Sequence, residues 1–94
     1  MIIVESVLGS ASDDAWTRRL RTARVDELRL DQAEAYKSRF RKATSSRTEV
    51  AVSLERGTQL RDGDVLFWDS RGRVAIVARV ELPEVMVIDL RPLV

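Results

Sequence analysis

Two glycines and two aspartates stand close together in the segment LERGTQLRDGDVL, residues 54–66. Converging carboxylates can hold Ca²⁺ or Mg²⁺, and a glycine-rich loop that opens a helix can cradle phosphate. Asp62 and Asp64 lack the twelve-residue spacing of an EF-hand loop, and a strand-like run rather than a helix follows them. Asp-Gly-Asp is more often a turn, because Asp accepts nearby N–H groups and Gly supplies positive φ. We therefore predict structural turns at Gly57, Gly63 and Asp64, and no metal site.

The composition removes most of the usual catalytic and metal-binding groups. The 94 residues include no His and no Cys. Ser-His-Asp triads, thiol nucleophiles and disulfides are therefore excluded, and so is the commonest ligand of zinc and nickel. The serines have no base of the usual kind beside them, so nucleophilic catalysis is not expected. The sequence predicts a protein that is not an enzyme.

Charge and hydropathy also narrow the range of partners and locations. The net charge is +1, whereas a general nucleic-acid binder normally carries a clear basic excess. No apolar run approaches the roughly 18 residues of a membrane span. The start MIIVESVLGS lacks the basic region of a signal peptide and carries Glu5 within its apolar stretch. We expect a cytoplasmic protein that binds neither membrane nor nucleic acid.

Short strand patterns dominate the chain, with turns every eight to twelve residues. The period-two or β-rich runs are residues 2–7, 25–30, 39–44, 48–55, 65–68, 74–80 and 84–90. The first run is apolar on both faces and predicts a strand buried on most sides, ended by Gly9 and Ser10. A short helix or an ordered loop anchored by Trp16 fits residues 10–24, and Asp31 with Glu34 forms a capping-box pattern. We predict one mainly β domain over residues 1–94.

The predicted architecture is a small two-sheet sandwich or partly open barrel. It has about six short strands and one or two short helical turns. The runs at 65–68 and 74–80 are separated by five residues that contain Gly72, which predicts a hairpin.

The segment KSRFRKATSSR carries five basic residues, with no acid between Glu34 and Glu49. In a strand, Arg39 and Arg41 share one face and Phe40 lies on the other. Such a strand can be a solvated edge that charge protects from aggregation. It can also be a docking patch for an acidic surface or an extended peptide. The residues alone leave both interpretations open.

Taken in order, these motifs resemble the N-terminal domain of the urease accessory protein UreE family. Residues 37–41, KSRFR, match the K-S-R-x-R stretch of the family. The pattern L-x-R-G-x-x-L-x-x-G-D-x-L is matched in register by Leu54, Arg56, Gly57, Leu60, Gly63, Asp64 and Leu66. The opening IIVESVLG and the closing ARVELPEVMVIDL are also similar, so the likeness covers nearly the whole chain. SSR at 45–47 stands where the family often has Gly, which leaves that turn's geometry open.

The resemblance implies a non-enzymatic interaction domain of a nickel metallochaperone. Such a domain docks to the urease apoprotein and other urease accessory proteins for nickel delivery, and Lys37, Arg39 and Arg41 are our candidates for the contact. The family holds nickel through histidines of a second, C-terminal domain, which we expect to be absent here. The resemblance therefore implies no cofactor in this chain, nickel in the full-length protein, and a monomer or weak dimer.

An alternative from another class is a small β-barrel that binds RNA or single-stranded nucleic acid. Trp16, Tyr36 and Phe40 would stack on bases, as aromatics do in such modules. The small net charge counts against this alternative.

Overall fold

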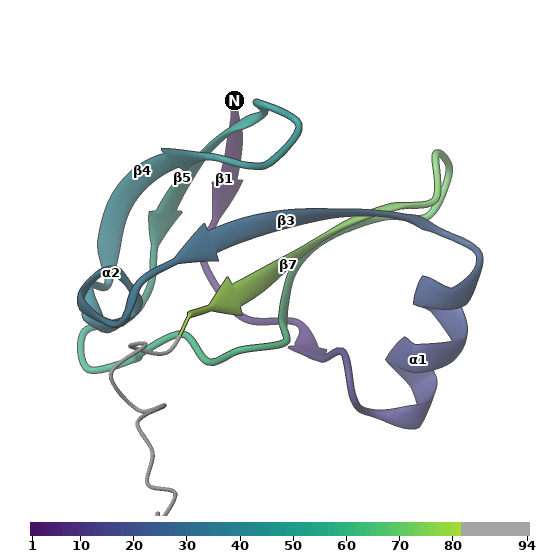
Figure 1. Cartoon of the computed structure of the whole chain (residues 1–94), viewed down its shortest axis with the longest axis horizontal. Coiled ribbons are helices and arrows are strands. Elements are labelled where there is room, and N and C mark those ends of the chain that lie inside the picture. Colours follow the sequence, from purple (N-terminus) through teal and green to yellow (C-terminus); the bar gives the residue numbers. More distant parts are fainter. Residues whose placement is uncertain (82–94) are drawn as a thin grey trace, which may run out of the picture.

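The computed structural model describes residues 1–81 (Figure 1). This part of the chain forms seven strands and two helices. In chain order they are β1 (Ile2–Val4), β2 (Gly9–Ser10), α1 (Asp14–Arg21), β3 (Arg24–Leu30), α2 (Gln32–Tyr36), β4 (Arg39–Ala43), β5 (Glu49–Ser53), β6 (Asp64–Asp69) and β7 (Val74–Val80). The predicted mainly β fold is confirmed. The strand predicted at residues 84–90 lies outside the described residues.

The strands form two mixed sheets. One has the order β1-β5-β4, and the other has the order β2-β6-β7-β3. β1 runs parallel to β5 and β3 runs parallel to β7, whereas the remaining pairs are antiparallel. Neither sheet closes on itself within residues 1–81, so the two-sheet, open architecture that the sequence predicted is correct.

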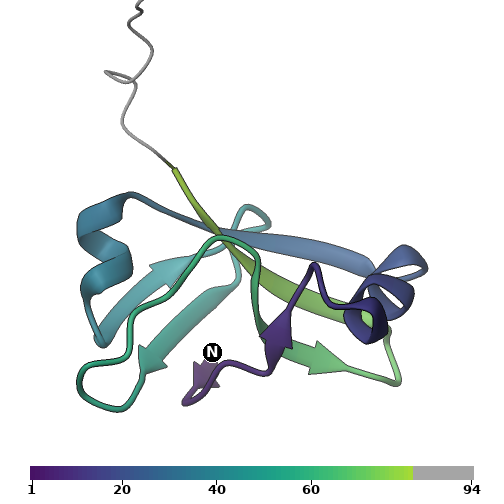
Figure 2. The ribbon, with the colours of Figure 1, turned by 90° about the horizontal axis from the view of Figure 1, so that it is seen from below.

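The main hydrophobic core is shared by both sheets. Alternate residues of each central strand point into it, as the period-two pattern requires. Its buried members are Val4, Leu28, Leu30, Ala35, Val50, Val52, Leu54, Leu60, Leu66, Ile76 and Ala78. A smaller cluster of Trp16, Val65 and Val77 joins α1 to the opposite face of the four-stranded sheet. Helix α1 thus lies at one end of the molecule and α2 at the other (Figure 2).

The prediction for the first strand is wrong. β1 ends at Val4, and Gly9 and Ser10 form β2 in the other sheet instead of ending the first strand. The chain crosses from one sheet to the other between Val4 and Gly9, so only the first half of the apolar run at residues 2–7 forms a strand. Ile3 remains 67% exposed, because β1 is an edge strand whose second face meets no other layer among residues 1–81.

Three local predictions are confirmed. The carboxylate of Asp31 accepts the N–H of Glu34 at 2.8 Å, and the N–H of Asp31 donates to the Glu34 carboxylate at 3.0 Å, which completes the capping box. β6 and β7 form the predicted hairpin, with an irregularity between Val65 and Phe67. Residues 10–24 include a helix, and its Trp16 is buried.

The two turns of the LERGTQLRDGDVL segment have matching geometry. Gly57 and Gly63 each have φ of +90°, and each is third in a four-residue turn. The closing hydrogen bonds run from Thr58 N–H to the Glu55 carbonyl (3.0 Å) and from the residue-64 N–H to the residue-61 carbonyl (3.1 Å). A positive φ at the third position is what a type II turn requires, and Gly adopts it without a steric penalty.

Gly63 also ties three segments together through its main chain. Its N–H donates to the Ala78 carbonyl of β7 (2.8 Å), and its carbonyl accepts the Ala11 N–H that follows β2 (2.7 Å). A Cβ at this position would meet no atom within 4 Å. Any cost of a side chain at Gly63 therefore comes from the backbone conformation and not from a clash.

Replacing Gly63 by Val should destabilise the protein by about 1–3 kcal/mol, because a β-branched residue is strained at positive φ. Gly63→Asn should cost clearly less, since Asn tolerates this region. Urea unfolding followed by circular dichroism would measure both. If the Val and Asn variants had the midpoint of the parent, φ at Gly63 would not constrain the fold.

Candidate functional site: the outer face of the three-stranded sheet

One face of the three-stranded sheet points away from the core and combines apolar and basic side chains. Ala51 of β5 lies between Ile3 of β1 and Arg41 of β4 in register. Two residues before Arg41 on β4, Arg39 lies beside Ser53 of β5 on the same face. Arg39, Arg41 and Ile3 are exposed, and Ala51 is half-buried. We call these five residues the outer face.

The predicted contact residues lie partly on this face. Arg39 and Arg41 share it, while Phe40 between them packs against the core, as predicted from the alternation. Lys37 is exposed as well, but it is the C-cap of α2 and precedes the strand. Ile3 was missed as a surface residue, because an apolar run on both faces suggested burial.

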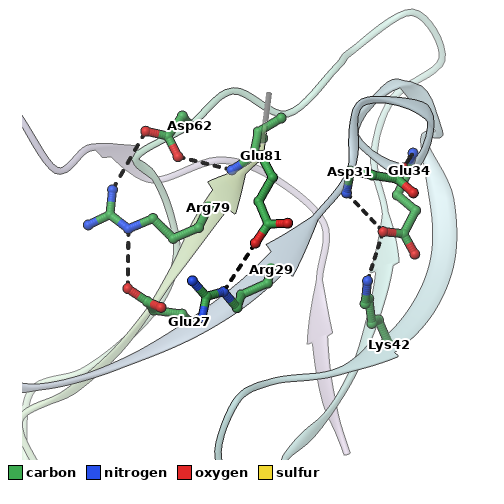
Figure 3. A network of polar contacts seen from close by, with 9 residues as sticks. Glu27, Arg29, Asp31, Glu34, Lys42, Asp62, Arg79 and Glu81 are labelled. Carbon is green, nitrogen blue, oxygen red and sulfur yellow. Dashed lines mark hydrogen bonds and ion pairs between the residues drawn. The ribbon is translucent and has the colours of Figure 1, made fainter. Parts of the chain in front are cut away.

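The cations of the basic stretch fall into two groups. Lys42 points to the core side, where its Nζ contacts a carboxylate oxygen of Glu34 at 2.7 Å (Figure 3). That hydrogen bond, with a second from the Asp31 N–H, holds the pKa of Glu34 below its ordinary value. Within residues 1–81, no ion pair includes Lys37, Arg39 or Arg41. Their charge is therefore available to a partner.

A hollow of about 290 Å³ opens at the start of β4, beside the outer face. Ser38, Arg39, Leu54 and Arg56 line it. The N–H of Leu54 donates to the Ser38 carbonyl at 2.7 Å, which holds the two segments together. Two guanidinium groups beside one small hollow suit a carboxylate, because the guanidinium fork matches its two oxygens. Arg56 was not predicted as a contact, although it belongs to the same motif as Gly57.

Both borders of this sheet are edge strands. In the described part of the chain, β1 and β4 each pair only with β5. An edge strand presents unpaired N–H and carbonyl groups that an extended peptide can match.

The carboxylate of Asp26 fixes the far end of β4. Asp26 on β3 is 8% exposed, and its oxygens accept the Thr44 hydroxyl (2.6 Å) and the Ser46 N–H (3.1 Å) in the β4–β5 turn. The Ser45 N–H also donates to the Glu27 carbonyl at 2.9 Å. Burial alone would raise the pKa of Asp26, but the hydrogen bonds from Thr44 and Ser46 outweigh it and lower the pKa.

The acidic turn that suggested a metal site has its carboxylates engaged elsewhere. Asp62 accepts the Val80 N–H at 2.9 Å and lies 3.8 Å from Arg79, which also contacts Glu27 at 3.4 Å (Figure 3). Asp64 accepts the main-chain N–H at residue 61 at 2.8 Å. No group of three potential metal-ligating side chains converges among residues 1–81.

The aromatic residues do not form a platform for nucleic-acid bases. Trp16 is 8% exposed, and Phe40 packs against the core. Of the three residues considered for stacking, Tyr36 alone is largely exposed, at 66%. Stacking on successive bases needs several accessible rings, so this geometry disfavours the nucleic-acid alternative.

Comparison with known proteins decides the family. The family model described as the UreE urease accessory protein, N-terminal domain, matches residues 4–79. The chain belongs to the UreE family. It is 47% identical to the urease accessory protein UreE of Yersinia bercovieri and 48% identical to that of Yersinia intermedia, each over 99% of this chain. The aligned region covers 41% and 42% of those two relatives, so the chain spans less than half of their length. The match to UreE, predicted from the motifs, is confirmed.

No helix among residues 1–81 of this UreE-family chain is long and apolar enough to span a membrane.

Asp26→Asn should lower the free energy of unfolding by about 1–3 kcal/mol near neutral pH, because a neutral amide replaces a carboxylate that accepts hydrogen bonds on both of its oxygens. The folded pKa of Asp26 lies below the unfolded value of about 3.9, so its contribution is complete above that pH and declines as the pH falls further. Urea unfolding at several pH values should show that the difference in the free energy of unfolding between parent and variant narrows below about pH 4. The exposed Glu5→Gln serves as control. A gap that stays constant down to the acid transition would contradict this role for Asp26.

Proposed function

We propose that this chain is a non-enzymatic docking domain of a nickel metallochaperone. In this proposal it binds the urease apoprotein and its accessory proteins through the outer face, while nickel is delivered to the urease centre. The observation that supports it most directly is the presence of Arg39 and Arg41, exposed and without an ion pair within residues 1–81, on the same sheet face as Ile3 in a chain of the UreE family.

The outer face suggests how a partner is recognised. Ile3 and Ala51 offer apolar area, and exposed apolar patches rimmed by charge commonly mark interaction sites. A carboxylate of the partner enters the hollow between Arg39 and Arg56. A segment of the partner extends along the free edge of β4 and adds main-chain hydrogen bonds. Charge then sets the encounter rate and the specificity, and the apolar centre supplies affinity.

Nickel is the cargo in this proposal, and the residues that hold it belong to another part of the full-length protein. This chain has neither His nor Cys to offer, and its acidic turn is already hydrogen-bonded. We further propose that residues 1–94 fold as one domain, work in the cytoplasm, and remain monomeric or weakly dimeric by themselves.

The double variant Arg39→Ala and Arg41→Ala should weaken binding to the purified urease apoprotein complex by about tenfold or more, because each charged contact contributes of the order of 1 kcal/mol. Titration by biolayer interferometry measures the effect, and the affinity of the parent should fall with added salt. Arg29→Ala with Arg61→Ala removes the same charge elsewhere and should retain binding. Unchanged affinity in the Arg39/Arg41 variant would remove both residues from the docking site.

Calorimetric titration of this chain with Ni²⁺ should give no micromolar binding, since imidazole and thiolate ligands are missing. Any weak heat should be the same for Asp62→Asn as for the parent. A micromolar dissociation constant would show that carboxylates of this chain form a nickel site.

A further inference from the structure

A second basic surface lies at the opposite end of the molecule from β4. Helix α1 and the β6–β7 turn come together there, far from β4 and α2 (Figures 1 and 2). We call it the arginine end, and it comprises Arg18, Arg19, Arg21, Arg71 and Arg73. All five residues are exposed, and none forms an ion pair within residues 1–81.

The two tryptophans of the chain pack against each other at the arginine end and connect α1 to β6. Trp16 of α1 and Trp68 of β6 meet edge to face, with ring centroids 5.8 Å apart. The Arg19 guanidinium lies 4.6 Å from the Trp16 ring centre, and the Arg73 guanidinium lies 5.8 Å from that of Trp68. Cation–π contacts of this kind fix the orientation of a guanidinium without neutralising its charge.

Hydrogen bonds join the β6–β7 turn to the connection between α1 and β3. The carbonyl of Arg73 accepts the Arg24 N–H at 2.8 Å, and the Arg73 guanidinium donates to the Thr22 hydroxyl. Arg73 itself has a φ of +53°. Residues about fifty positions apart in sequence thus form one surface, in which the side chains of Arg19 and Arg73 are already held in place before a partner binds.

No acid within residues 1–81 forms an ion pair with these arginines, although Asp13, Asp14 and Asp69 lie on the same elements. One carboxylate oxygen of Asp69, at the end of β6, accepts the Arg71 N–H at 3.1 Å. The helix dipole accounts for basic residues in the last turn of α1. It does not account for Arg71 and Arg73, which lie outside the helix, in the β6–β7 turn.

We propose that the arginine end is a docking site for an acidic protein surface. Guanidinium groups held on aromatic rings present their donors to carboxylates in fixed geometry. Nucleic acid suits the site less well, because Trp16 is buried, Trp68 is half-buried against it, and an arginine lies over each indole ring. This inference does not rest on the proposed function, which places its contact at the other end of the molecule.

The two tryptophans also provide the test, because both lie at the arginine end and the chain has no others. An oligoglutamate peptide is titrated into ¹⁵N-labelled protein, and the indole N–H signals of Trp16 and Trp68 are followed. They should shift together with the amides of α1 and residues 70–73. The triple variant Arg18→Gln, Arg21→Gln and Arg71→Gln should lose about tenfold in affinity at these signals while the indoles keep their unbound positions.

A matched triple variant, Arg29→Gln, Arg47→Gln and Arg61→Gln, removes the same charge elsewhere and should bind as the parent does. Equal weakening in both variants would mean that only net charge matters, and would overturn the proposal. So would indole signals that stay fixed, or tighter binding of a single-stranded oligonucleotide at the same residues. Shifts confined to the β4 amides would support the proposed function and refute this inference, so the two can fail separately.

Discussion

The buried carboxylate of Asp26 is the interaction on which the arrangement of the two sheets depends. It lies on β3 of one sheet and accepts hydrogen bonds from Thr44 and Ser46 at the turn of the other. A carboxylate this buried is costly unless its oxygens are satisfied, so the turn must stay where its donors meet them. Apolar packing between sheets lets strands slide, whereas two directed bonds to one carboxylate allow one register. These hydrogen bonds also position the outer face, because Arg39 and Arg41 lie on β4, the strand that leads into the turn.

Local features of the fold could be predicted from sequence where a few adjacent residues decide the outcome. The capping box at Asp31 and Glu34 and the β6–β7 hairpin are of this kind. The pairings of β1 with β5 and of β3 with β7 are not, because parallel partners lie far apart in the chain and carry no turn between them. In β3, Asp26 interrupts a face that is otherwise apolar, with Leu28 and Leu30. The sequence could not show that Thr44 and Ser46, eighteen and twenty residues later, supply the donors.

In the candidate site too, some residues could be placed from local sequence and others could not. Alternation placed Arg39 and Arg41 on one face and Phe40 on the other, because period two follows from strand geometry alone. The exposure of Ile3 depends on which strand lies at the border of the sheet, and Arg56 lies at the hollow with Arg39 because the chain after β5 is held against Ser38 by the Leu54 N–H. Both features depend on tertiary structure and not on the local sequence. Lys42 shows the converse, since it belongs to the same basic run yet is neutralised by Glu34 on another element.

The net charge of +1 conceals an uneven distribution of charge. Four acids, Glu27, Glu34, Asp62 and Glu81, are engaged with Arg29, Lys42 and Arg79. Within residues 1–81, the arginines at the two ends of the molecule form no ion pair. Fields of like charge fall off within a Debye length of about 8 Å at physiological salt, so each end acts on its own surroundings. A near-neutral domain can therefore present two separate basic surfaces, and its overall charge is a poor guide to what it binds.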